Sequence, residues 1–134
     1  MPTLLIIDDD DNIGVVLRKS LRGYDVTLAT TAEEGLDLVS RRAFDGILCD
    51  LHLPRKSGVD FHAALVAMRP ELEPRLLFMT GGALTPEAEH FLSERPDQVV
   101  SKPFELERIR RTVARIVQRT APLAPGPVTI VGAG

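Results

Sequence analysis

Polar residues with the capacity for chemistry stand directly after four of the short apolar stretches of this sequence. They are Asp8 and Asp9, Asp50, Thr80 and Lys102, which follow the first, third, fourth and fifth stretches respectively. Carboxylates brought together repel one another, and they cluster stably only when they are protonated or neutralised by a cation. Carboxylates with a lysine and a hydroxyl suit phosphoryl transfer, which depends on positioning and charge neutralisation.

Each of these side chains has a role in such a reaction. Asp50 would attack phosphorus as the nucleophile and form an aspartyl phosphate. Lys102 would offset negative charge, and Thr80 would donate a hydrogen bond to the product. The acidic cluster implies a hard divalent cation, and Mg²⁺ is favoured because it takes oxygen ligands and keeps positions for water and phosphate oxygens. A calcium loop does not fit, since Ile13 and Lys19 stand where it needs glycine and glutamate.

Five apolar stretches of strand length must position these residues. They cover residues 3–7, 24–29, 46–49, 75–79 and 98–101. Between them apolar residues recur every three or four positions, as in amphipathic helices. The alternation predicts an α/β fold with a doubly wound, five-stranded parallel sheet covered by helices on both faces. Because the carboxyl ends of parallel strands share one edge, the polar residues should converge there.

Local signals mark where two of the helices begin and which residues they bury. Thr31 opens a capping-box pattern, and Thr85 precedes a proline at the first helical position. Apolar stripes are expected in the third and last helices, at Phe61, Leu65 and Met68, and at Leu106, Ile109, Val113 and Ile116. Cys49 is expected to be a buried apolar residue, and His62 and His90 are expected to be solvated.

Composition narrows the class of protein. The 134 residues allow one domain, and a single cysteine excludes an internal disulfide and a cysteine-built metal site. A net charge of −3 without tryptophan argues against direct nucleic-acid binding. The first residues fit neither a signal peptide nor a membrane-spanning helix, so no membrane association and a cytoplasmic location are expected.

The end of the sequence differs in character. Residues 1–119 form the predicted domain, and residues 120–134 a tail or truncated linker rich in proline and glycine. Residues 128–134 resemble the start of a dinucleotide-binding motif, but that motif needs a further helix and strand. We expect residues 128–131 to pack or pair as an added strand, because they are apolar.

The segments LLIIDDDD, ILCDLHLPRKSG, LLFMTGG and VSKPF resemble, in order and spacing, the motifs of response-regulator receiver domains. The resemblance extends from residue 3 to about residue 119 and implies a flavodoxin-like fold with strand order 2-1-3-4-5. It implies Mg²⁺ held by Asp9, by Asp8 through water, by Asp50 and by the backbone carbonyl of His52. Asp50 would receive its phosphoryl group from a sensor histidine kinase, a phosphotransfer protein or a small acyl phosphate.

The same resemblance assigns the switch and the partners. Thr80 and Lys102 match the family's switch hydroxyl and lysine, and Pro103 stands where a cis peptide is usual. The family often has an aromatic switch residue where this chain has Val99, which puts the usual switch in doubt. A downstream protein is the expected target, and the resemblance allows a homodimer through the fourth helix, fifth strand and fifth helix.

Three functions stay open at this point. The first is a receiver phosphorylated on Asp50 that signals through protein contacts and catalyses only its own phosphorylation and dephosphorylation. The second is a receiver-like scaffold that does not depend on phosphate, an alternative favoured by Val99. The third is a phosphatase of the haloacid-dehalogenase type with Asp8 as nucleophile and Asp10 as acid. Against it, Asn12 stands where that family needs threonine or valine, and a late acidic pair is missing.

Overall fold

The computed structural model describes residues 1–120, in which strands and helices alternate. The elements are β1 (Thr3–Ile7), α1 (Asp11–Ser20), β2 (Asp25–Ala29), α2 (Ala32–Arg41), β3 (Gly46–Asp50), α3 (Gly58–Met68), η1 (Pro70–Arg75), β4 (Leu76–Thr80), α4 (Pro86–Ser93), η2 (Pro96–Gln98), β5 (Val99–Ser101) and α5 (Leu106–Thr120). Residues 121–134 of the predicted tail, with the strand expected at 128–131, lie outside the described residues.

The five strands form one parallel sheet in the order β2-β1-β3-β4-β5, as predicted. The central strands β3 and β4 are buried along their whole length, whereas β2 at the edge is mostly half-buried. Both faces of a parallel sheet are covered by its crossover helices, so its inner strands consist of continuous apolar residues. The fold class predicted from the alternating pattern is confirmed.

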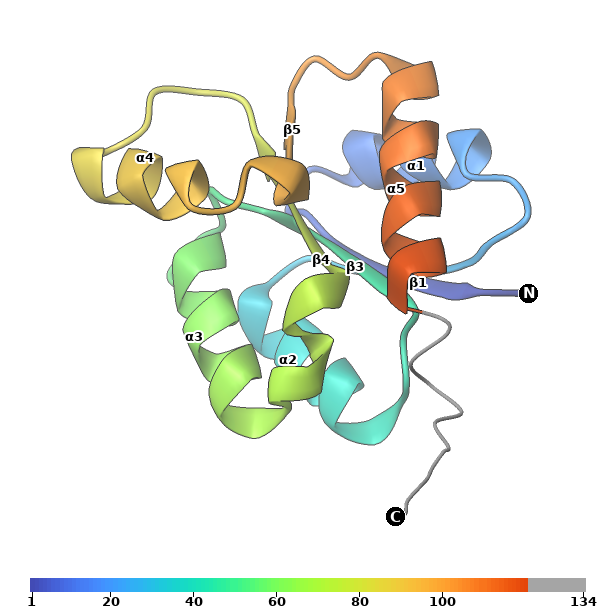
Figure 1. The fold of residues 1–134 in the computed structure, drawn as a ribbon, viewed down its shortest axis with the longest axis horizontal. Coiled ribbons are helices and arrows are strands. Elements are labelled where there is room, and N and C mark those ends of the chain that lie inside the picture. The colour runs from blue at the N-terminus through green and yellow to red at the C-terminus, as the bar shows by residue number, and fades with distance from the viewer. Residues whose placement is uncertain (121–134) are drawn as a thin grey trace.

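Helices cover the two faces of the sheet in two groups (Figure 1). On one face α1 and α5 bury Leu17, Ile109 and Val113 in a shared apolar cluster. On the other face α2, α3 and α4 form a second cluster, with Phe61 and Leu65 among its fully buried residues. The sheet therefore lies between two separate apolar cores, and the loops that follow the strands lie at its carboxyl edge.

Polar side chains fix the start of four helices. The N-caps Asp10, Thr31 and Thr85 each accept a hydrogen bond from a backbone N–H of the first turn, and Ser57 forms a capping box with Asp60. The predicted starts at Thr31 and Thr85 are confirmed. The side chain of Glu34 accepts from the backbone N–H of Thr30, one residue before the cap, rather than from Thr31 itself.

The boundaries and the apolar stripes differ from the predictions in small ways. β3 and β4 include Asp50 and Thr80, because Asp50 pairs with Met79 and Thr80 with Ser101 across the sheet. Met68 and Leu106 are exposed, so their predicted burial is wrong: each lies at a helix end where the stripe leaves the sheet. Within residues 1–120, no helix combines the length and apolar character that crossing a bilayer requires.

Gly58, the first residue of α3, lies close to the strand that ends in Asp50. Its backbone N–H donates to the carbonyl of Leu51 at 2.9 Å. A Cβ atom at this position would lie 2.8 Å from the backbone oxygen of Asp50 and 2.9 Å from the Cα of Leu51. Both are backbone atoms that cannot rotate away, so α3 can start this close to β3 only with glycine here.

We predict that Gly58→Ala lowers the free energy of unfolding by about 1–3 kcal/mol, the usual cost of an added methyl group in a packed site. Urea denaturation measures the change. Gly82→Ala is the matched control, because a Cβ at Gly82 meets no atom within 4 Å, and it should change stability by less than about 0.5 kcal/mol. Equal effects of the two substitutions would contradict the close approach.

Candidate functional site

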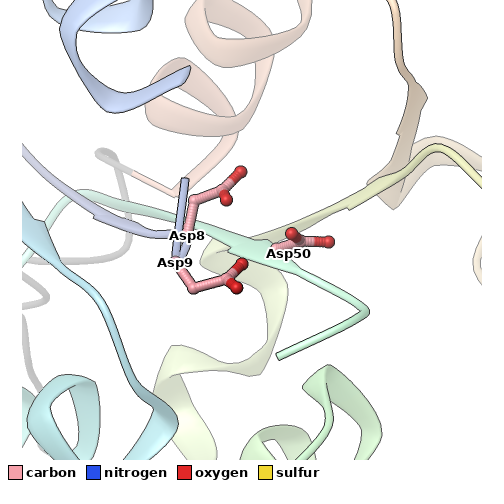
Figure 2. A group of neighbouring side chains, drawn as sticks. All are labelled: Asp8, Asp9 and Asp50. Carbon is pink, nitrogen blue, oxygen red and sulfur yellow. The ribbon is translucent and has the colours of Figure 1, made fainter. Parts of the chain in front are cut away.

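The predicted site residues meet at the carboxyl edge of the sheet. Asp8 follows β1, Asp50 ends β3, Thr80 ends β4 and Lys102 follows β5. Figure 2 shows the carboxylates of Asp8, Asp9 and Asp50 gathered at this edge. Asp8 and Asp50 are buried, at 4% and 5% exposure, whereas Asp9 is exposed to solvent. Residues from opposite ends of the sequence thus form one cluster, as the sheet topology predicts.

The three aspartates form a compact acidic cluster. One oxygen from each carboxylate lies within 4.8 Å of the others. The ammonium of Lys102 contacts Asp8 Oδ2 at 2.8 Å and Asp50 Oδ2 at 3.1 Å. One lysine against three carboxylates leaves two negative charges that no ion pair of the described residues offsets.

Backbone N–H groups hold the two buried carboxylates in place. Asp8 Oδ1 accepts from the N–H of Asp10 at 2.9 Å, and Asp50 Oδ1 accepts from the N–H of His52 at 3.0 Å. Lys102 donates to the other oxygen of each carboxylate, so both oxygens of Asp8 and of Asp50 are held by hydrogen bonds. Within residues 1–120, Asp9 has no hydrogen bond or ion pair, which leaves both of its oxygens available to a cation.

The surroundings shift the pKa values of Asp50 and Lys102. Burial raises the pKa of Asp50 and the charge of Asp8 adds to this, although hydrogen bonds from His52 and Lys102 oppose the rise. Burial alone would lower the pKa of Lys102, but its bonds to Asp8 and Asp50 outweigh that effect and raise it. Lys102 therefore stays charged at neutral pH.

Thr80 ends β4 and Lys102 directly follows the neighbouring strand β5, and both line an open groove. The N–H of Lys102 donates to the carbonyl of Thr80 at 2.7 Å, which holds the two residues together across the sheet. The groove has a volume of about 340 Å³, and Thr80, Lys102, Gly81, Gly82, Leu84 and Ser101 line it. The groove therefore opens the side of the site that carries Thr80 and Lys102. The Lys102–Pro103 peptide is cis, as the resemblance implied.

The structure brings together the side chains of Asp8, Asp9, Asp50 and Lys102 directly, with Thr80 beside them. Two further residues are expected to take part, His52 through its backbone carbonyl and Val99 at the switch position. The backbone N–H of His52 donates to Asp50, a contact that the sequence could not reveal because every residue except proline carries that group. Val99 lies on β5, where it pairs with Phe78 of β4.

The donor set suits a hard divalent cation. Carboxylate oxygens are the ligands that Mg²⁺ prefers, and it is commonly held by one or two of them. The two unbalanced charges of the cluster give a physical reason for such an ion, because buried like charges need neutralisation. The acidic pocket is consistent with Mg²⁺-dependent phosphorylation of an aspartate.

The chain is similar to response regulators in sequence. The family model of the response regulator receiver domain matches residues 4–114. Response regulator MprA from Mycobacterium sp. (strain KMS) is 31% identical over 121 residues, covering 89% of this chain and 52% of that protein. The transcriptional regulatory protein DltR from Streptococcus agalactiae serotype III (strain NEM316) is also 31% identical, over 87% of this chain and 51% of that protein. The chain spans about half the length of these curated relatives.

Solved structures agree on the fold. The non-phosphorylated HemR receiver domain from Leptospira biflexa has a TM-score of 0.72 and 28% identity, covering 87% of this chain and 94% of that chain. A receiver domain of a sensor histidine kinase from Pseudomonas aeruginosa PAO1 has a TM-score of 0.72 and 24% identity, covering 87% and 98% of the two chains. That structure has a magnesium ion coordinated in its active site cleft.

These similarities exclude one of the three functions left open by the sequence. The matched family and the strand order are those of receivers, so the alternative of a haloacid-dehalogenase phosphatase is wrong. The chain belongs to the response regulator receiver domain family, and it is a signalling module of two-component signal transduction.

Proposed function

We propose that Asp50 is the phosphoryl acceptor of this receiver and that Mg²⁺ binds at Asp8, Asp9, Asp50 and the backbone carbonyl of His52. The observation that carries the proposal is the buried Asp50 carboxylate, held by the N–H of His52 and the ammonium of Lys102 next to two further carboxylates. A fixed nucleophile beside a cation and a cation site is what phosphoryl transfer requires.

The reaction conserves atoms and charge in a simple displacement. A carboxylate oxygen of Asp50 forms a bond to phosphorus, while the bond from phosphorus to the donor's imidazole nitrogen or acyl oxygen breaks. The leaving group keeps the electron pair of that bond. Lys102 offsets charge on the transferred group, and Thr80 donates a hydrogen bond to the phosphoryl oxygens. Bound Mg²⁺ would neutralise the oxygens of the transferred group.

The donor and partners that we propose follow from the family. A sensor histidine kinase or a phosphotransfer protein phosphorylates Asp50 in the cytoplasm, and the output is contact with a downstream protein. A homodimer through α4, β5 and α5 is supported by charge, since α4 carries acidic residues and α5 basic ones. These are Glu87, Glu89 and Glu94 in and after α4, and Arg108, Arg111 and Arg115 in α5.

We assign the receiver domain to residues 1–119 and a tail to residues 120–134.

We predict that incubation with acetyl phosphate and Mg²⁺ adds one phosphoryl group to the protein and that Asp50→Asn abolishes the addition, because an amide is not a nucleophile for phosphorus. Intact-protein mass spectrometry measures the mass shift. Asp11→Asn, at the exposed start of α1, is the control and should be phosphorylated like the wild type. A mass shift retained in Asp50→Asn would refute the assignment.

That experiment also separates the receiver from the scaffold that does not depend on phosphate. A wild-type chain that takes up no phosphoryl group under these conditions would favour the scaffold. Uptake on Asp50 shows acceptance, and it leaves the consequence for a partner to a binding measurement.

We predict that Mg²⁺ raises the thermal unfolding midpoint of the wild type, because a ligand that binds only the folded chain stabilises it. In Asp9→Asn the Mg²⁺ concentration needed for the same rise in midpoint should increase by about 10-fold or more, since even the loss of a residue that only hydrogen-bonds a metal ligand lowers metal affinity by that factor. Asp9 is exposed and unpaired within the described residues and lies next to two other carboxylates, so its replacement should not lower the Mg²⁺-free midpoint. An equal loss in Asp11→Asn would indicate general charge attraction instead of a defined site.

The raised pKa of Asp50 predicts a pH-dependent stability. An acid whose pKa is higher in the folded chain than in the unfolded one binds more protons when folded. The folded chain therefore loses stability as the pH rises from 3.8, the ordinary pKa, through the raised value. Asp50→Asn removes this loss, so its gain in unfolding free energy over the wild type should be larger at pH 7 than at pH 4.

Urea denaturation at the two pH values, with a chelator to exclude divalent ions, measures this difference. Asp37→Asn is the control, because the Asp37 side chain is 62% exposed on the surface of α2. A gain from Asp50→Asn that is the same at both pH values would contradict the raised pKa.

A further inference from the structure

An aromatic cluster joins α3, β4 and α4. The ring of Phe91 in α4 lies 5.2 Å from that of Phe78 in β4 and 5.0 Å from that of His62 in α3, both edge to face. This is a favourable geometry for aromatic pairs. The expectation that His62 is solvated is wrong, because its side chain is only 14% exposed and lies among these rings. The apolar stripe of α3 did not indicate this, since the partners come from other elements.

Arg95 packs on the outer side of this cluster and contacts the carboxyl end of α4. Its guanidinium carbon lies 3.9 Å from the centre of the Phe91 ring, in a cation–π contact. Its Nη1 donates to the carbonyl of Phe91 at 2.8 Å, and its Nε lies 3.6 Å from Glu73 Oε2 of η1. The carboxylate of Glu73 also lies 3.3 Å from His62 Nε2. The carboxyl end of α4 is therefore fixed to α3 and η1.

The amino end of α4 has fewer attachments. Gly81 and Gly82 precede the helix in an exposed loop, and Pro86 and Glu87 in its first turn are exposed. Within α4, only Leu92 is buried. Elements with few buried apolar contacts belong to the less stable part of a structure and move most readily. α4 is thus held by polar and aromatic contacts at its carboxyl end, whereas near its amino end only the half-buried Leu84 and Ala88 pack against the core.

Phe78 connects this cluster to the candidate site. It lies two residues before Thr80 in β4, so both side chains are on the same face of the sheet. Val99 pairs with Phe78 in the neighbouring strand and is only half-buried. The short side chain at Val99 brings no ring to Phe78 from β5, and the ring that contacts Phe78 from the helix side belongs to Phe91.

We propose that Phe91 transmits the state of the site to α4, by its ring contact with Phe78. When Thr80 hydrogen-bonds the phosphoryl group, the end of β4 shifts and Phe78 moves with it. Phe91 follows, and α4 turns about the end that Arg95 holds. The proposal rests on the function proposed for Asp50 and names the residue that carries its signal outward in a chain with Val99 in the switch position.

The test compares hydrogen–deuterium exchange of residues 84–95 before and after phosphorylation with acetyl phosphate and Mg²⁺. In the wild type, phosphorylation should change exchange in this segment by about twofold or more, since α4 belongs to the weakly held part of the fold. Phe91→Leu keeps an apolar side chain but removes the ring. It should take up the phosphoryl group within about twofold of the wild-type rate and show no change in exchange.

Phe104→Leu is the matched control, because Phe104 is a half-buried phenylalanine in the cluster on the opposite sheet face. It should keep the wild-type response. Arg95→Gln is a second variant that leaves Phe91 in place. It removes the cation–π contact and the ion pair to Glu73, and it should speed exchange of α4 in the unphosphorylated protein.

The outcomes separate the two proposals. A phosphorylated Phe91→Leu chain that still changes exchange in α4 overturns the role of Phe91 and leaves the acceptor role of Asp50 standing. A wild-type chain that gains no mass overturns both. Uptake by both chains with a response only in the wild type and in Phe104→Leu supports the role of Phe91.

Discussion

The charge imbalance at the carboxyl edge of the sheet governs the rest of this structure. Asp8 and Asp50 are nearly excluded from water, and Lys102 contacts both of them. Burying a carboxylate without a partner is costly, so the lysine is what allows two acids to lie side by side in the absence of metal. β5 ends directly before Lys102, and the backbone N–H of Lys102 donates to the carbonyl of Thr80 at the end of β4.

The sequence predicted the fold and most of the site because both depend on patterns that repeat along the chain. Apolar strands alternate with amphipathic helices, and parallel strands must bring their carboxyl ends together. Asp8, Asp50, Thr80 and Lys102 each stand at such an end, so their convergence follows from topology alone. The starts of α2 and α4 were predictable for a local reason, since Thr31 and Thr85 cap the chain that follows them.

What the sequence could not predict depends on contacts between distant residues or on the backbone. The N–H of His52 that holds Asp50 is a group that every residue except proline carries, and the burial of His62 depends on Phe91 and Glu73 from other elements. The short 3₁₀ helices η1 and η2 begin at Pro70 and Pro96 and contain too few residues to show a period. Met68 fits the helical spacing, but α3 ends at that residue, away from the sheet.

Cys49 adds a last property to the site. It is fully buried in β3 next to Asp50, and burial raises the pKa of its thiol far above the physiological range, helped by the charges of Asp50 and Asp8. Oxidants and alkylating reagents react with the thiolate, which is almost absent under these conditions. Burial and the raised pKa therefore protect the thiol of Cys49 from oxidation in the folded domain, although it lies next to Asp50 in β3. Such reagents can reach Cys49 only after the sheet has opened. The rate at which the thiol is modified therefore measures unfolding of the core.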